Sequence, residues 1–450
     1  MSALIDRILD ARRINGRQLS IVSVVYSALV IDGIDVQLLS LVAPLVLADW
    51  GIGREAFGPA MSAALLGSSF GSSIGGGLGD RYGRKNVLVA ATLLFGLCTV
   101  LAAYTNTVMG MTLLRLAGGF GFGAALPTSV ALVSEWLPTR ARARVAGMTS
   151  TGTPLGGMLG AAFLIGLVSM VGWRGCFVLF GVVSLLFGLL AWIALPESPS
   201  YLVSRGRAAR AATLMSKQLG VAFRPEDLES VPDAAEGVSG TAPVVATERV
   251  FDRVNLRLNI GSWLGFFGVY FVAYGIAAWS PVLLTGAGMT LPQALRASFV
   301  YNLCAVTSAL VHGQVVTRFG SRRLLIVGCA LTLGSIVALT YGVAAVRADP
   351  AGPGNLLVVI ASGGLGAFNG ALIALIYGVL AHGFPPSCRA GGVGMAMMMG
   401  RAGGIVSSFF GGTLLSLAGG QGTPFLVALG AAAFLALAGT LVIDRHVAPA

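Results

Sequence analysis

Two aspartates three residues apart interrupt a strongly apolar stretch of the chain. Asp32 and Asp35 lie on either side of Gly33 in the segment YSALVIDGIDVQLLSLVAPLVLADW. Residues three apart lie on one face of a helix, so both carboxylates can face the same central cavity. An ionised Asp at the centre of a membrane helix costs about 2.5–3.5 kcal/mol. Burial and mutual repulsion should make at least one of them hold a proton, which is the chemistry that proton coupling requires.

Two arginines interrupt other apolar stretches. Arg115 lies at the start of LLRLAGGFGFGAALP, and Arg401 lies about ten residues into the stretch 391–415. A guanidinium in a cavity can hold a carboxylate through two parallel hydrogen bonds, and we expect this of Arg401 first and of Arg115 second. Two alternatives remain open at this point. Arg115 and the aspartates can form a purely structural ion pair, and Arg401 can cap backbone carbonyls between helices.

Rings and amides recur in three further apolar stretches. Tyr270 and Tyr274 are one helical turn apart, and Asn302 and Asn369 each follow an aromatic residue. Aromatic faces stack on aromatic ligands, so these four residues are candidates for a slot that holds a ring. The alternative is that they pack helices together or face lipid.

A polar motif, GDRYGRK, occupies residues 79–85 between two apolar stretches. Its glycines permit a tight turn, and its charges can bond to neighbouring helix ends in one conformation and release them in another. A simple role in setting the orientation of the chain in the membrane explains Arg84 nearly as well. The interpretation as a latch therefore depends on Asp80 and Arg81. The expected conformational latch consists of Gly79, Asp80, Arg81, Gly83, Arg84, Glu135 and Arg389.

The composition of the chain identifies the elements that must position these residues. Of 450 residues, 56% are hydrophobic and 10% charged, and the mean hydropathy is +0.85. Apolar stretches of about 20 residues are the length that crosses a bilayer. The sequence predicts an all-α membrane protein with twelve transmembrane helices, near 21–47, 57–78, 87–104, 108–133, 146–168, 174–195, 256–285, 295–316, 323–343, 355–381, 391–415 and 423–443.

Basic residues are distributed unevenly between the connecting segments. With the N-terminus inside, cytoplasmic segments hold 23 of the 29 Lys and Arg residues and external loops hold four. This imbalance places both termini in the cytoplasm and explains the basic character without nucleic acid. We expect a cytoplasmic amphipathic N-terminus at 1–20, six-helix lobes at 21–195 and 256–443, a cytoplasmic linker at 196–255 and a tail at 444–450. The linker begins with a basic amphipathic surface helix and continues as a flexible acidic segment.

The two halves of the chain resemble each other. LPTRARARVAGMTSTGTPLGG aligns without a gap on FPPSCRAGGVGMAMMMGRAGG, which pairs Arg142 with Arg389 and places Arg401 opposite Pro154. GGGLGDRYGRKN has a counterpart in HGQVVTRFGSRR, although the acid is replaced there. A tandem repeat of this kind is typical of transporters whose site lies between two lobes.

With these motifs in view, the chain resembles the major facilitator superfamily along nearly its whole length. It is most similar to the aromatic acid:proton symporter family, through Asp-Gly-Ile-Asp at 32–35, Arg115 before a Gly-rich helix, and RAGGVGMAMMMGRAGGI at 389–405. The resemblance implies a monomeric carrier in the bacterial cytoplasmic membrane. It also implies import of a small aromatic carboxylate, of the benzoate or hydroxybenzoate type, together with a proton.

Other functions are less compatible with the sequence. Five cysteines and three histidines are scattered, so we expect no metal site, no cofactor and no enzymatic activity. A porter for another organic anion or for a sugar remains an alternative, although the stretch 256–285 lacks the paired glutamines of sugar porters. A transporter-like membrane sensor is an alternative from a different class.

Overall fold

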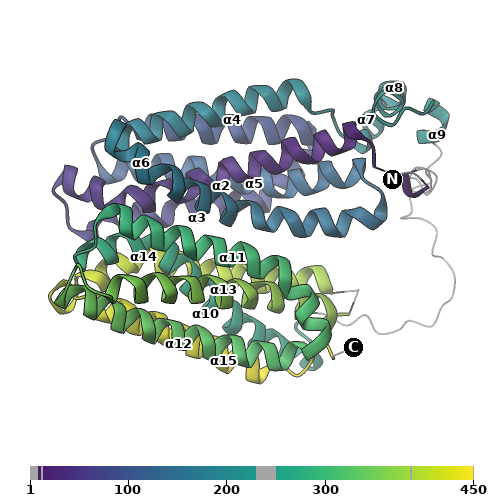
Figure 1. Ribbon diagram of the computed structural model, residues 1–450. Helices are drawn as coiled ribbons and strands as arrows, with labels where there is room; N and C mark the ends of the chain where they lie inside the picture. Colours follow the sequence, from purple (N-terminus) through teal and green to yellow (C-terminus); the bar gives the residue numbers. More distant parts are fainter. Residues whose placement is uncertain (1–8, 12–13, 230–249, 386–387, 449–450) are drawn as a thin grey trace.

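The computed structural model describes residues 9–11, 14–229, 250–385 and 388–448, and within these ranges it consists of helices and contains no strand. Figure 1 shows the two halves of the chain as two bundles that lie side by side. Most of the acidic part of the expected linker falls outside the described residues.

The N-terminal lobe consists of five long helical elements that follow each other in the chain. They are α2 (Gly16–Trp50), α3 (Gly58–Tyr82), α4 (Arg84–Ala102), α5 (Val108–Trp136) and α6 (Thr139–Ala194), with the short helix η1 (Arg54–Phe57) between α2 and α3. The element α6 contains two spans, because Gly172 has φ 67° and ψ 178° and interrupts the helix there. This lobe therefore has six spans.

The C-terminal lobe consists of α10 (Leu256–Gly286), α11 (Leu291–Phe319), α12 (Ser321–Ala348), α13 (Gly354–Gly383), α14 (Arg389–Ser416) and α15 (Thr423–Val442). Ten elements of the described chain are long and apolar enough to cross a membrane. Counting α6 twice and adding α3, whose Gly- and Ser-rich sequence packs against α5, gives the twelve predicted spans. The protein is a multi-pass membrane protein, as predicted.

The two lobes repeat the same close helix contacts. A Cβ atom on Gly119 would lie 2.2 Å from the carbonyl oxygen of Ala64, and one on Gly366 would lie 2.0 Å from that of Tyr301. The first pair joins α5 to α3 and the second joins α13 to α11, at equivalent places in the repeat. Only a residue without a side chain allows backbones to approach this closely.

Three short helices connect the lobes at one end of the molecule. They are α7 (Pro199–Ser204), α8 (Ala208–Leu219) and α9 (Pro225–Glu229). Figure 1 shows these short helices at one end of the two bundles, which we call the linker end; the opposite end, which carries η1, is the η1 end. The prediction of an amphipathic helix is correct for α8, but its apolar face packs on the N-terminal lobe beside Trp136 and does not lie open to lipid headgroups.

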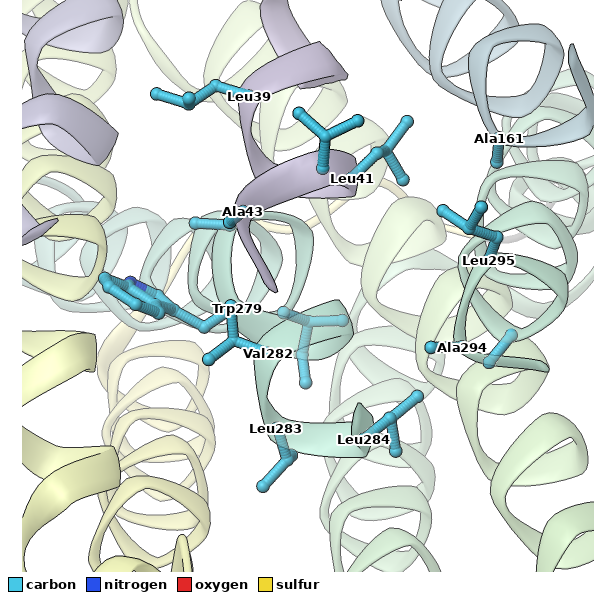
Figure 2. Packing of buried hydrophobic residues seen from close by; sticks show 14 of the residues in the cluster. Leu39, Leu41, Ala43, Ala161, Trp279, Val282, Leu283, Leu284, Ala294 and Leu295 are labelled. Carbon is cyan, nitrogen blue, oxygen red and sulfur yellow. The ribbon is translucent and has the colours of Figure 1, made fainter. Parts of the chain in front are cut away.

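Buried apolar side chains form one shared core at the η1 end and two separate cores at the linker end. The shared core joins both lobes, and Figure 2 shows Leu39 and Ala43 of α2 near Trp279 and Val282 of α10. At the linker end, the described residues form one cluster within the N-terminal lobe and another within the C-terminal lobe. The lobes are thus packed together at the η1 end.

Candidate functional site

Asp35 is held inside the N-terminal lobe by residues of two neighbouring helices. The Thr99 hydroxyl on α4 donates a hydrogen bond to its carboxylate. Nη1 of Arg115 on α5 lies 3.6 Å from the carboxylate and donates a 3.0 Å hydrogen bond to the backbone oxygen of Asp35. The ring of Phe177 lies 5.1 Å from the guanidinium carbon of Arg115. The structure therefore brings Asp35 and Arg115 together as a buried ion pair.

Asp32 lies one turn earlier on α2 and has different surroundings. Its side chain is 1% exposed, and neither carboxylate oxygen has a hydrogen-bond donor among the described residues. Asp35 is 0% exposed. Both side chains are buried in this conformation, so neither carboxylate is open to a water-filled central cavity as expected.

Gly33 explains how α2 can carry these residues against α6. A Cβ atom at this position would lie 2.7 Å from backbone atoms of Thr153. Any side chain there would force α2 and α6 apart. This close packing helps to seal the aspartates within the lobe.

Arg401 lies at the contact between the lobes, near the middle of α14. Its side chain is half-buried and donates to the Ser72 hydroxyl and, at 3.5 Å, to the backbone oxygen of Ser69, both on α3. No ion pair joins it to an acid in the part of the chain that the structure describes. Its two partners are neutral, so its charge is not balanced locally.

Aromatic rings line the same side of α14. Tyr270 and Tyr274 of α10 are stacked with centroids 5.8 Å apart, and the Tyr270 hydroxyl lies 3.1 Å from that of Tyr377 on α13. These rings lie close to α14 because Gly400 and Gly404 face them: added Cβ atoms would come within 3.2 and 2.8 Å of Tyr270 and Tyr274, respectively. Arg401 lies between these two glycines in the chain. Guanidinium and rings thus share one region.

The two predicted asparagines are buried and already have partners. Asn302 and Gln37 exchange amide hydrogen bonds of 3.1 and 3.2 Å, which join α11 to α2 across the lobes. The Asn369 amide donates to the backbone oxygen of Val269 at 3.2 Å. Neither asparagine is exposed beyond 2%. In this conformation they hold helices together.

The GDRYGRK motif forms a turn that is bonded to the end of α5. Gly83 has φ 99°, a conformation that favours glycine, and Arg84 forms an ion pair with Glu135 and lies 3.4 Å from Asp80. Asp80 and Arg81 are exposed. The expectation that Asp80 and Arg81 stand out is therefore not met, because Arg84 makes the buried contact.

The segment after α6 completes this cluster, although none of its residues was predicted to belong to the latch. The Ser198 hydroxyl donates to Glu135 at 2.6 Å, and the Lys85 amide donates to Glu197 at 3.0 Å. A signal was available, since Glu197 and Ser198 begin the linker directly after a span.

Arg389 lies in the other lobe and joins no member of this cluster. Its Nε donates to the Phe384 carbonyl at 3.3 Å, as that of Arg142 donates to the Leu137 carbonyl at 3.1 Å. These pairs occupy equivalent places in the repeat.

Comparison with known proteins identifies the family of this two-lobed chain. The family model described as Major Facilitator Superfamily matches residues 25–349. The chain belongs to the major facilitator superfamily. Among solved structures, the xylose transporter XylE from E. coli in a partially occluded inward open conformation has a TM-score of 0.71 at 19% identity, covering 96% of this chain and 99% of that one. This likeness confirms the fold of a major facilitator.

Relatives of known function within the superfamily show which transporters the chain is similar to. It is 30% identical to the 4-hydroxybenzoate transporter PcaK of Pseudomonas aeruginosa, over 97% of this chain and 95% of that protein. It is 31% identical to the gallate transporter of Pseudomonas putida, over 94% of this chain and 90% of that protein. The resemblance to the aromatic acid symporters is thereby confirmed.

Proposed function

We propose that this major facilitator is a proton-coupled importer of a small aromatic carboxylate of the benzoate or hydroxybenzoate type. Its relatives at 30–31% identity carry 4-hydroxybenzoate and gallate. The observation that carries the proposal is Arg401, a half-buried cation at the lobe contact, beside stacked tyrosines and without an acid partner among the described residues.

The substrate carboxylate binds the Arg401 guanidinium in place of its serine contacts. A carboxylate offers two oxygens to the planar fork, which neutral hydroxyl and carbonyl groups do not. The substrate ring then packs against Tyr270 and Tyr274, whose faces suit an aromatic partner. Asn302 and Asn369 contribute only after the lobes move, because their amides are engaged in this conformation.

The linker end faces the cytoplasm and the η1 end faces outward in the bacterial cytoplasmic membrane. Cytoplasmic segments of this topology hold 23 of the 29 Lys and Arg residues, which supports the orientation. The shared apolar core then closes the outer end, while the inner end has a separate core in each lobe. Alternating access requires the shared core to separate and the inner halves to meet.

Proton coupling resides in the Asp32 and Asp35 region of α2. Two acids and one arginine are buried in the N-terminal lobe, and only Asp35 lies beside the arginine, so gain or loss of a proton changes the net charge of that lobe. The Arg84–Glu135 cluster acts as the conformational latch at the inner end of the same lobe. Its bonds join α4, α5 and the segment that leads to α7.

The direct test is uptake of labelled 4-hydroxybenzoate into proteoliposomes that contain the purified protein. With an inside-alkaline pH gradient we expect accumulation above the external concentration, and a protonophore should abolish it. Benzoate should compete, whereas xylose and succinate should not. The proposal would be refuted if accumulation continued after the pH gradient was collapsed, or if xylose alone competed with the labelled substrate.

A further inference from the structure

The interior of the N-terminal lobe encloses three formal charges. Asp32, Asp35 and Arg115 are 1%, 0% and 5% exposed. The helices in contact with α2 include α3, α4, α5, α6, α8, α10 and, through the Asn302–Gln37 hydrogen bonds, α11, and their other charged residues stand toward the ends of the spans or on α8. The remaining titratable groups in the middle turns of α2 and these helices are phenols and thiols, which are neutral at pH 7 in their ordinary state: Tyr26, Cys98, Cys176, Tyr270, Tyr274, Tyr301 and Cys304.

The two acids have unequal access to hydrogen-bond donors. Asp35 accepts from the Thr99 hydroxyl and lies 3.6 Å from Nη1 of Arg115, so its negative charge is compensated. Asp32 has no donor for either oxygen among the described residues. A buried carboxylate without a donor or counter-ion costs far more than a buried carboxylic acid, which is neutral.

The balance of charge also indicates that one of the two acids is protonated. One arginine balances one carboxylate, so the enclosed interior is neutral only when the second acid carries a proton. We propose that Asp32 carries the transported proton, whereas Asp35 stays ionised as the positioning residue that holds Arg115. Lobe movement exposes Asp32 to water, where the proton leaves to the cytoplasm or is taken up from outside. This division of labour deepens the proposed function and, for its transport arm, rests on it.

Infrared spectroscopy of the purified protein in lipid tests the proton assignment without any substrate. A protonated carboxyl in an apolar site gives a C=O stretching band that shifts in D₂O. We expect such a band in the wild type and its loss in Asp32→Asn, which leaves one carboxylate for one arginine. Asp32→Glu should move the band and Asp35→Glu should leave it in place, because both variants keep two acids and one arginine in the interior. The exposed Asp444→Asn is the matched control and should leave the band unchanged. A band that moves in Asp35→Glu and stays in place in Asp32→Glu, or one that persists in Asp32→Asn, would overturn the assignment.

The transport arm separates the two roles of the acids. Asp32→Asn resembles the permanently protonated form, so it should lose concentrative uptake but retain substrate exchange across the membrane. Asp35→Asn removes the carboxylate that holds Arg115 in place, so it should lose exchange as well. The double variant Asp35→Asn/Arg115→Gln should recover exchange. Retained gradient-driven accumulation in Asp32→Asn would overturn the proposal. If the wild type does not accumulate aromatic acids but the infrared assignment holds, the proposed function fails and this inference stands.

Discussion

Arg115 and Arg401 differ in what balances their charge, and this difference separates their roles. Arg115 is 5% exposed and lies beside Asp35, with the face of Phe177 on the guanidinium. Arg401 is half-buried and contacts only neutral oxygen atoms of Ser72 and Ser69. A second buried carboxylate would compete with Asp35 for Arg115, whereas Arg401 gains a counter-ion when a carboxylate arrives. The geometry therefore favours Arg401 for substrate binding.

Replacing Arg401 by Lys should weaken binding of 4-hydroxybenzoate about ten- to hundredfold. An ammonium keeps the charge but cannot offer two parallel N–H groups, and a charge-assisted hydrogen bond contributes roughly 1.5–3 kcal/mol. Equilibrium binding of labelled substrate to the purified protein measures the effect. The exposed Arg323→Lys is the control and should leave the affinity unchanged. Wild-type affinity in Arg401→Lys would remove this residue from the site.

Single polar residues on apolar helices were the hardest features to predict. The acids at 32 and 35 stand out because ionised groups are costly in lipid, and the arginines stand out for the same reason. Gln37, Ser72 and Thr99 are neutral residues whose importance comes from partners far away in the chain. Tyr377 lies eight residues after Asn369, on the same face of α13, and that spacing was the only available signal.

The helices themselves were predictable because their length and apolar character are fixed by the bilayer. The predicted span 57–78 corresponds to α3, and 391–415 corresponds to α14. The observed helices are a few residues longer than the predicted apolar stretches, because each helix continues through polar residues that lie outside the lipid. Which helix face meets which neighbour was not predictable, because glycine contacts such as that of Gly33 with Thr153 depend on the tertiary arrangement.

At the scale of elements, Glu135 links three segments at the linker end of the N-terminal lobe. It pairs with Arg84 at the start of α4 and accepts hydrogen bonds from the Ser198 hydroxyl and the Ser200 amide. A carboxylate can accept all of these at once, because it has several lone pairs and a full negative charge. The cluster fixes the turn at Gly83 relative to α5 and α7.

Glu135→Gln should lower the maximal uptake rate several-fold and leave substrate affinity unchanged. The amide cannot form the ion pair with Arg84, so the turn is held less firmly, while the residues around Arg401 are untouched. Initial uptake rates over a range of substrate concentrations, with equilibrium binding, distinguish the two effects. Glu226→Gln on exposed α9 serves as the control. A loss of affinity at an unchanged maximal rate would contradict a latch.

At the scale of the whole molecule, the η1 end is closed by both apolar and polar contacts between the lobes. The shared core contains Trp279 and Leu38, both 0% exposed. On the surface, the Ser416 hydroxyl donates to Glu55 at 2.7 Å, and this hydrogen bond lowers the pKa of the Glu55 carboxyl. The carboxylate therefore remains ionised at neutral pH and keeps this contact. Opening of the η1 end must break the entire set.

Gly58 at the start of α3 offers a way to hold the η1 end open. A Cβ atom here would lie 2.1 Å from the carbonyl oxygen of Phe409 on α14, across the lobe contact. Backbone atoms on both sides cannot yield as a flexible side chain can, so Gly58→Ala should drive the lobes apart at this end. In a helix the substitution alone would otherwise be favourable by about 1 kcal/mol. We therefore expect an altered balance of conformations in a protein that still folds.

Spin labels at Tyr104 and Ala351, both exposed at the η1 end of opposite lobes, measure this opening. The distance distribution in Gly58→Ala should shift to longer values, and gradient-driven uptake should fall because the η1 end no longer closes. Gly430→Ala is the matched control, since a Cβ atom at Gly430 meets nothing within 4 Å. Unchanged distances with full uptake in Gly58→Ala would mean that the contact of α3 with α14 does not close the η1 end. The shared core around Trp279 alone would then have to form the gate.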